Sequence, residues 1–177
     1  MGGKLLFIDL ETGGLDQLKH SVLSVGYILY DDENNEVIKH GGFYIKQHEY
    51  IVTGEALEVN NIDLREVHKR GISFYQFYEK LKDFAKKYGK LTLAGWNVGF
   101  DQRFLMSLLG YRYEGLFHYK ALDVASIYYA WSGKWGSLEE VAKELLDKED
   151  GDFHTATYDI WVTLQIYKFL KEKIRGR

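Results

Sequence analysis

Hydrophobic residues in the first 46 positions follow the patterns expected of β-strands. The run KLLFIDL at residues 4–10 is typical of a buried strand. Residues 20–32 and 36–46 are rich in β-branched and aromatic side chains, and an acidic, Asn-rich turn separates them. This arrangement predicts a β-hairpin that follows the first strand, and so three strands in an antiparallel meander.

A helical period replaces the strand pattern after residue 72. Hydrophobic side chains recur on one side of residues 74–88, which predicts an amphipathic helix. Ser73 and Gln76 have the spacing of a capping box at its start, and Gly89 ends it. The preceding stretch, residues 46–72, is expected to be mostly loop, with one short helix near residues 63–70 that Gly71 would end.

Strands and helices alternate in the rest of the chain. Short strands are expected at residues 91–95 and 119–123, each leading into a helix, and further helices at residues 137–146 and at the C-terminal end. The order predicts an α/β fold with a mixed five-stranded sheet, a three-strand antiparallel meander plus parallel strands, flanked by helices. Residues 1–177 show no linker or repeat and are expected to form a single domain.

Composition narrows the classes of function. The chain has no cysteine, which excludes disulfides, thiolate metal sites and cysteine nucleophiles. The formal net charge of −3 argues against sequence-independent coating of duplex DNA, although a nuclease that holds a few nucleotides remains compatible with it. The apolar run LLFI is too short for a signal peptide or a membrane span, so we expect a cytoplasmic protein without membrane contact.

Asp9 and Glu11 lie two residues apart at the end of the first strand, so both carboxylates point to one face of the sheet. Asp101 and Asp159 each lie in the first turn expected of a helix, where the helix dipole favours an anion, after the expected caps Asn97 and Thr155. Each acid alone is more often a solvated charge than a ligand. Together they would repel one another strongly unless bound cations compensate them.

Oxygen ligands without cysteine select hard cations, Mg²⁺ or Mn²⁺. Two such ions about 4 Å apart are a known solution for phosphodiester cleavage. His154, which directly precedes Thr155, could accept a proton from the attacking water if it lies on the loop before the helix. The five residues therefore predict a metal-dependent hydrolase of phosphodiesters.

Three motifs resemble those of one enzyme family. FIDLETGGL is similar to the first motif of the DnaQ-like (DEDDh) 3′–5′ exonucleases, within the ribonuclease H-like superfamily, and NVGFDQRFL is similar to their second motif. HTATYD matches the His-x-Ala-x-x-Asp third motif, and Thr155 stands where the sister branch carries Tyr. The resemblance spans residues 7–159, and it is specific because order, spacing and flanking residues all agree.

The resemblance implies roles for the five acid and base residues. Asp9 would bridge two Mg²⁺ ions, for which Mn²⁺ can substitute, while Glu11 and Asp159 hold the ion that activates the water. Asp101 would hold the second ion, largely through waters, and His154 would be the general base. The implied reaction releases nucleoside 5′-monophosphates from a single-stranded 3′ end.

The resemblance also implies the residues that hold the substrate. The Thr12 backbone and Leu15 would contact the base and sugar of the terminal nucleotide, and Asn97 and Phe100 would flank the scissile end. Many relatives carry His where Trp96 is found, and a Trp could either stack on a base or fill the core.

Three functions are compatible with the sequence. The first is an exonuclease acting on single-stranded DNA. It is favoured because Glu-Thr-Gly-Gly-Leu resembles the first motif of proofreading enzymes more than the Glu-Met-Thr-Gly form of oligoribonucleases. The second is an RNA exonuclease of the oligoribonuclease or ribonuclease T type, and the third is a binding module without activity. The complete set of acids argues against the third. A proofreading role would need a polymerase or other protein partner, and relatives of the RNA type form homodimers.

Overall fold

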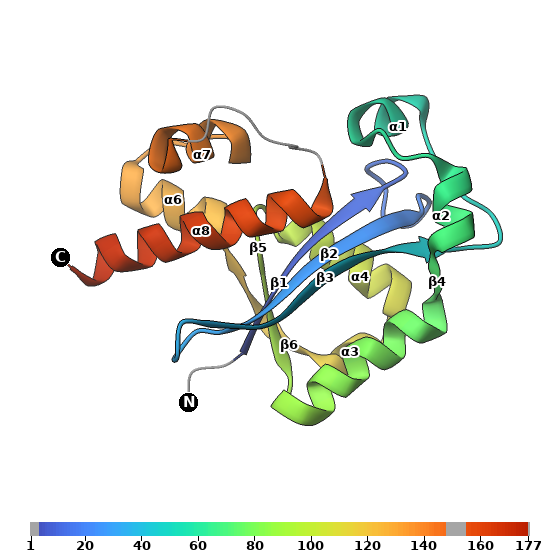
Figure 1. Cartoon of the computed structure of the whole chain (residues 1–177), viewed down its shortest axis with the longest axis horizontal. Coiled ribbons are helices and arrows are strands. Elements are labelled where there is room, and N and C mark those ends of the chain that lie inside the picture. The colour runs from blue at the N-terminus through green and yellow to red at the C-terminus, as the bar shows by residue number, and fades with distance from the viewer. Residues whose placement is uncertain (1–3, 148–154, 177) are drawn as a thin grey trace.

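The computed structural model describes residues 4–147 and 155–176 as one α/β arrangement around a mixed sheet (Figure 1). The strands are β1 (Lys4–Thr12), β2 (Val22–Asp31), β3 (Glu36–Lys46), β4 (Ile72–Ser73), β5 (Leu91–Gly95) and β6 (Phe117–Asp123). The helices are α1 (Gly54–Asn60), α2 (Leu64–Arg70), α3 (Phe74–Tyr88), α4 (Gly99–Leu109), the 3₁₀ helix η1 (Gly110–Arg112), α5 (Tyr113–Leu116), α6 (Val124–Ser132), α7 (Leu138–Leu146) and α8 (Ala156–Arg175).

The sheet has the strand order β4-β3-β2-β1-β5-β6. Strands β1, β2 and β3 form the predicted antiparallel meander, and β5 and β6 extend it in parallel on the β1 side. Within the described residues the sheet has six strands, not the five that were expected. The additional strand, β4, has two residues and pairs in parallel with Ile45 and Lys46 at the end of β3.

The predicted starts and stops of two helices are confirmed. Ser73 and Gln76 form the capping box of α3, and Gly89, with φ of 81°, follows its last residue. Gly71 follows α2 directly, as expected. The interval 46–72 also contains α1, which was not predicted, and Thr53 caps this helix by accepting a hydrogen bond from the Ala56 N–H at 3.1 Å.

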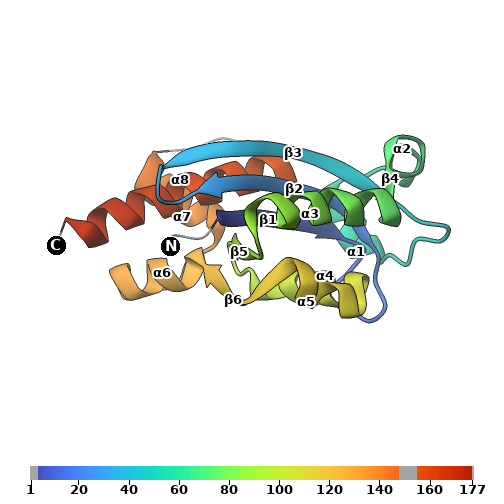
Figure 2. The ribbon, with the colours of Figure 1, turned by 90° about the horizontal axis from the view of Figure 1, so that it is seen from below.

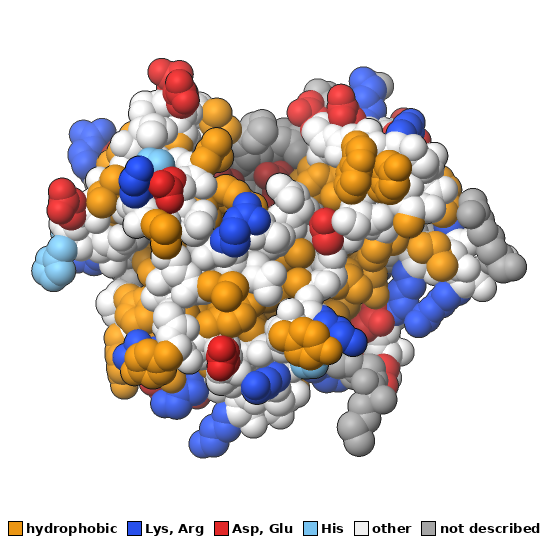
Figure 3. Space-filling view, turned by 180° about the vertical axis from the view of Figure 1, so that it is seen from behind, with side chains coloured by type: hydrophobic (Ala, Val, Ile, Leu, Met, Phe, Trp, Pro, Cys, Tyr) orange, Lys and Arg blue, Asp and Glu red, His pale blue; other side chains and the backbone are white. Residues whose placement is uncertain are grey.

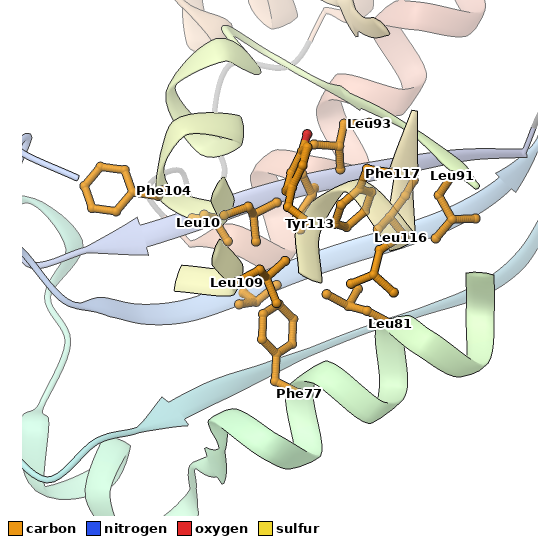
Figure 4. Close-up of a cluster of buried hydrophobic side chains, with 14 of the residues drawn as sticks. Leu10, Phe77, Leu81, Leu91, Leu93, Phe104, Leu109, Tyr113, Leu116 and Phe117 are labelled. Atoms are coloured by element: carbon orange, nitrogen blue, oxygen red, sulfur yellow. The ribbon is translucent and has the colours of Figure 1, made fainter. Parts of the chain in front are cut away.

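Two hydrophobic cores cover the two faces of the sheet, because successive side chains of a strand point to opposite faces. Leu6, Ile8 and Leu10 of β1 join the core under α3, α4 and α5, part of which is drawn in Figure 4. Leu5 and Phe7 join the core under α6, α7 and α8. Seen from below, the helices lie on both sides of the curved sheet (Figure 2). The alternation therefore directs the next odd-numbered residues of β1 toward the face that α8 covers.

Candidate active site

Three carboxylates meet where β1 ends and α8 begins. Asp9 and Glu11 continue the odd-numbered series of β1 after Leu5 and Phe7, and Asp159 lies in the first turn of α8. One oxygen from each of these three acids lies within 4.8 Å of the others, a spacing that a single cation can span. Figure 1 shows the same meeting point, with the carboxyl end of β1 close to the first turn of α8.

Two glycines allow α8 to approach the sheet this closely. Gly26 is the cross-strand partner of Asp9, and a Cβ at Gly26 would lie under 3.0 Å from the Ala156 carbonyl. A Cβ at Gly42 on the neighbouring strand would lie under 3.0 Å from the Thr157 side chain. Any larger residue would therefore push the first turn of α8 away from the sheet and Asp159 away from the other two acids.

Asp101 reaches the same region from the opposite side. It lies in the first turn of α4 and is 3% exposed, and its carboxylate accepts a hydrogen bond from the Leu10 N–H at 2.9 Å. Leu10 lies between Asp9 and Glu11, so this bond ties α4 to the strand that carries both acids. The structure thus brings together all four predicted carboxylates.

The expected cap of α4 is corrected. Asn97 does not cap the helix with its side chain, since α4 begins after Val98 and no side-chain cap bond is present there. Asn97 instead adopts the left-handed conformation with φ of 54°, and its N–H donates to the Asp123 carboxylate at 2.9 Å. Asp123 also caps α6 by accepting a hydrogen bond from the Ala125 N–H at 3.2 Å, so its role is structural.

Burial and mutual repulsion perturb the acids. Burial, then Asp101, Glu11 and Asp159, raise the pKa of Asp9 well above its ordinary value. The pKa of Glu11 is raised to about 7 by burial and by Asp159. Burial raises the pKa of Asp101 to about 8, although its hydrogen bond from Leu10 acts in the opposite direction. The metal-free cluster therefore holds protons near neutral pH, and a hard divalent cation fits it because all its donors are oxygens.

A pocket of about 510 Å³ opens beside the acids. Its lining contains Thr12, Leu15 and Phe100, three of the four residues that were expected to hold the substrate, and Asn97 is not among them. The sequence missed the wall that α1 contributes, including Val59 and Asn60. The Asn60 side chain donates to the Thr12 carbonyl at 3.2 Å, which fixes α1 against the end of β1.

A second cavity, of about 460 Å³, also has Glu11 in its lining. It is lined by polar groups of the sheet and of the α1–α2 segment together with the start of α8, among them Ser24, Arg70 and Thr157.

Two further expectations concern residues near the site. His154 lies outside the described residues, although the N-cap of α8 falls at Thr155, whose carbonyl accepts from the Asp159 N–H at 3.0 Å. Trp96 is half-buried and packs against the core under α6–α8, with its ring 6.3 Å from that of Tyr128. Of the two roles left open for Trp96, the structure shows the core role.

This fold and its acidic cluster define a nuclease of the ribonuclease H-like class, whose members depend on divalent metal ions. A family model described as exonuclease matches residues 6–167, and the chain belongs to this family of DnaQ-like 3′–5′ exonucleases. Among similar proteins are oligoribonucleases of Hydrogenovibrio crunogenus, 27% identical over 184 residues, and of Buchnera aphidicola, 28% identical over 187 residues. The alignments cover 96% of this chain in both cases, and 93% and 95% of the relatives.

The fold is also similar to that of E. coli exonuclease I in complex with a dT13 oligonucleotide. The TM-score is 0.82 at 20% sequence identity, over 98% of this chain and 42% of exonuclease I. This chain therefore matches about two fifths of that enzyme, and the likeness shows the shared fold. No helix among the described residues is long and apolar enough to span a bilayer.

Proposed function

We propose that this chain removes nucleoside 5′-monophosphates from the 3′ ends of single-stranded DNA with the help of two Mg²⁺ ions. The observation that carries the proposal is the cluster of Asp9, Glu11 and Asp159, whose oxygens lie within 4.8 Å of one another at the edge of an open pocket. These three acids, with Asp101, would hold the ions. Bound ions would supply a more acidic water and stabilise the charge that develops on the phosphate.

The residues of the chain would perform the remaining tasks. Leu15, Val59 and Phe100 give the pocket apolar walls that suit the base and sugar of the terminal nucleotide, and Leu15 is 84% exposed and so open to contact. His154 would take the proton from the attacking water. Since the family match covers nearly the whole chain and all six strands share one sheet, we also propose that residues 1–177 form a single exonuclease domain.

Short RNA is the second candidate substrate. It is supported by the relatives named oligoribonuclease, which align with this chain over 93% or more of their own length in the two cases above. DNA is supported by the sequence from Glu11 to Leu15, Glu-Thr-Gly-Gly-Leu, which resembles that of proofreading enzymes.

A time course on 5′-labelled single-stranded DNA and RNA, each long and very short, distinguishes the candidates. A ladder that shortens from the 3′ end of DNA in Mg²⁺ and stops in EDTA is the expected result. A ladder on RNA alone, fastest on the shortest oligomers, would favour the second candidate. Asp9→Asn should be inactive, and a ladder like that of the wild type in this variant would rule out the metal scheme. Absence of a ladder on every oligomer, with Mn²⁺ also tried, would refute the proposed activity.

A further inference from the structure

The outward face of α4, the helix whose first turn carries Asp101, has a line of exposed side chains. Arg103, Met106, Ser107 and Tyr111 are exposed, at the spacing of one helix face continued into η1, while Asp101 on the same helix is buried in the site. Met106 is 51% exposed and Tyr111 is 82% exposed. We call these four exposed residues the α4 track.

The charge of the α4 track is positive. Residues 99–113 contain two arginines and a single acid, Asp101, which belongs to the site. The Arg103 side chain turns back toward the start of α4, because a Cβ on Gly99 would lie 3.7 Å from Arg103 Nη1. Within residues 4–147 and 155–176 no ion pair involves Arg103, although its charge lowers the pKa of Asp101, so the guanidinium lies near the acids and remains available to an anion there.

The far end of the α4 track is an aromatic ring with a cation beside it. The Arg112 guanidinium lies 4.5 Å from the centre of the Tyr111 ring, which covers one face of the ring and limits its motion. Because Tyr111 remains 82% exposed, the rest of the ring is open to a planar partner. Figure 3 shows the back of the molecule as seen in Figure 1, where hydrophobic and basic side chains are interspersed across the centre.

We infer that the α4 track binds the single strand upstream of the nucleotide that is removed, with Arg103 on a phosphate and Tyr111 stacked on a base. This inference rests on the proposed function, because it assumes that the 3′ end lies at the acids. Exposed aromatic rings interleaved with cations are the usual means of holding single strands without sequence preference. Arg103 lies within the second motif but is neither an expected metal ligand nor the expected general base, and Tyr111 lies outside all three motifs.

The length of the track predicts which substrates use it. From Asp101 to Tyr111 the helical rise amounts to about 15 Å. A stacked strand advances about 3.4 Å per nucleotide, so Tyr111 would meet a base about four nucleotides upstream of the site. A dinucleotide is too short to reach it, whereas a decamer is long enough.

The experiment compares binding of a labelled dinucleotide and a labelled decamer, as DNA and as RNA, by fluorescence anisotropy with Ca²⁺ in place of Mg²⁺. Tyr111→Ala should weaken decamer binding about 5- to 100-fold, the range for loss of one base–aromatic stack, and leave dinucleotide binding unchanged. Tyr111→Phe should bind both as the wild type does. Arg103→Ala should make the negative slope of log affinity against log salt shallower by about 0.7, the contribution of one phosphate contact on a single strand.

Trp135→Ala is the matched control. Trp135 is 64% exposed on the segment between α6 and α7, two helices that lie well away from α4 in Figures 1 and 2, so this substitution should change the binding of neither oligomer. Equal losses of binding for both lengths in Tyr111→Ala, or no loss for either, would overturn the inference. A wild type that binds the decamer but never cleaves it in Mg²⁺ would refute the proposed function alone, because the binding comparison still decides the role of the track. A wild type that binds neither oligomer would refute both.

Discussion

Replacing Glu11 by Gln should stabilise the metal-free protein above neutral pH. The pKa of Glu11 rises from 4.5 to about 7 on folding, because burial and Asp159 disfavour its charge. The folded protein therefore binds more protons than the unfolded chain between these two values, so stability falls as pH rises through this window, and the whole penalty is present above about pH 7. Gln carries no titrating proton and escapes the penalty.

The size of the effect follows from the pKa change. At about 1.4 kcal/mol for each pH unit, a rise from 4.5 to about 7 corresponds to about 3 kcal/mol. Water that reaches the half-buried carboxylate screens part of this, so we expect about 2 kcal/mol at pH 8. For a chain of this length that is a gain of about 4–8 °C in Tm. At pH 5 the gain should shrink to under about 1 kcal/mol.

Thermal unfolding in EDTA at pH 5 and pH 8 measures the difference. Glu172→Gln, an exposed position on α8, is the matched control and should change Tm little at either pH. Adding Mg²⁺ at pH 8 should stabilise the wild type more than Glu11→Gln, because only the native site with all its acids binds the ion tightly. Equal stability of Glu11→Gln and the wild type at pH 8 in EDTA would refute the electrostatic reasoning.

The other predictions concern catalysis. EDTA should silence cleavage completely, and activity that survives the chelator would rule out the metal scheme. His154→Ala should lower turnover by about 10²–10⁴-fold while the Mg²⁺ concentration needed for half-activation changes little, so an unaltered rate would remove His154 from the mechanism. Asp9→Ala should abolish cleavage and leave the metal-free fold at least as stable, as checked by Tm. Gly26→Ala should cost about 1–3 kcal/mol and raise the Mg²⁺ requirement, whereas Gly115→Ala, where a Cβ meets no atom within 4 Å, should do neither.

The acid cluster was accessible to sequence reasoning because its geometry is local. The period of two along β1 places Asp9 and Glu11 on one face whatever the rest of the chain does. Asp101 and Asp159 each fall in a first helical turn, and the order of strands and helices brings these turns to one end of the sheet. The capping box of α3 was equally local, since the side chains of Ser73 and Gln76 each accept a hydrogen bond from the backbone N–H of the other residue.

The parts that sequence reasoning missed depend on distant contacts or on ambiguous residues. Helix α1 has only seven residues. It is held by a hydrogen bond from the Thr53 N–H to the Gly13 carbonyl at 2.7 Å and by another from the Asn60 side chain to the Thr12 carbonyl. A helix this short is marginal without such partners. Asn97 was assigned as a cap because Asn favours helix starts, yet Asn also tolerates the left-handed conformation that it adopts.

The position of Asp159 shows why the fold can keep mutually repelling acids together. Glycines on β2 and β3 admit the first turn of α8 so closely that its backbone rests on the sheet opposite Asp9. Further along α8, buried side chains such as Ile160 and Leu164 join the core under α6–α8 and hold the helix down. The hydrophobic burial of α8 thus opposes the repulsion among the carboxylates. A cation that relieves this repulsion should therefore stabilise the fold as it completes the site, so loss of the metal should weaken the fold and the activity together.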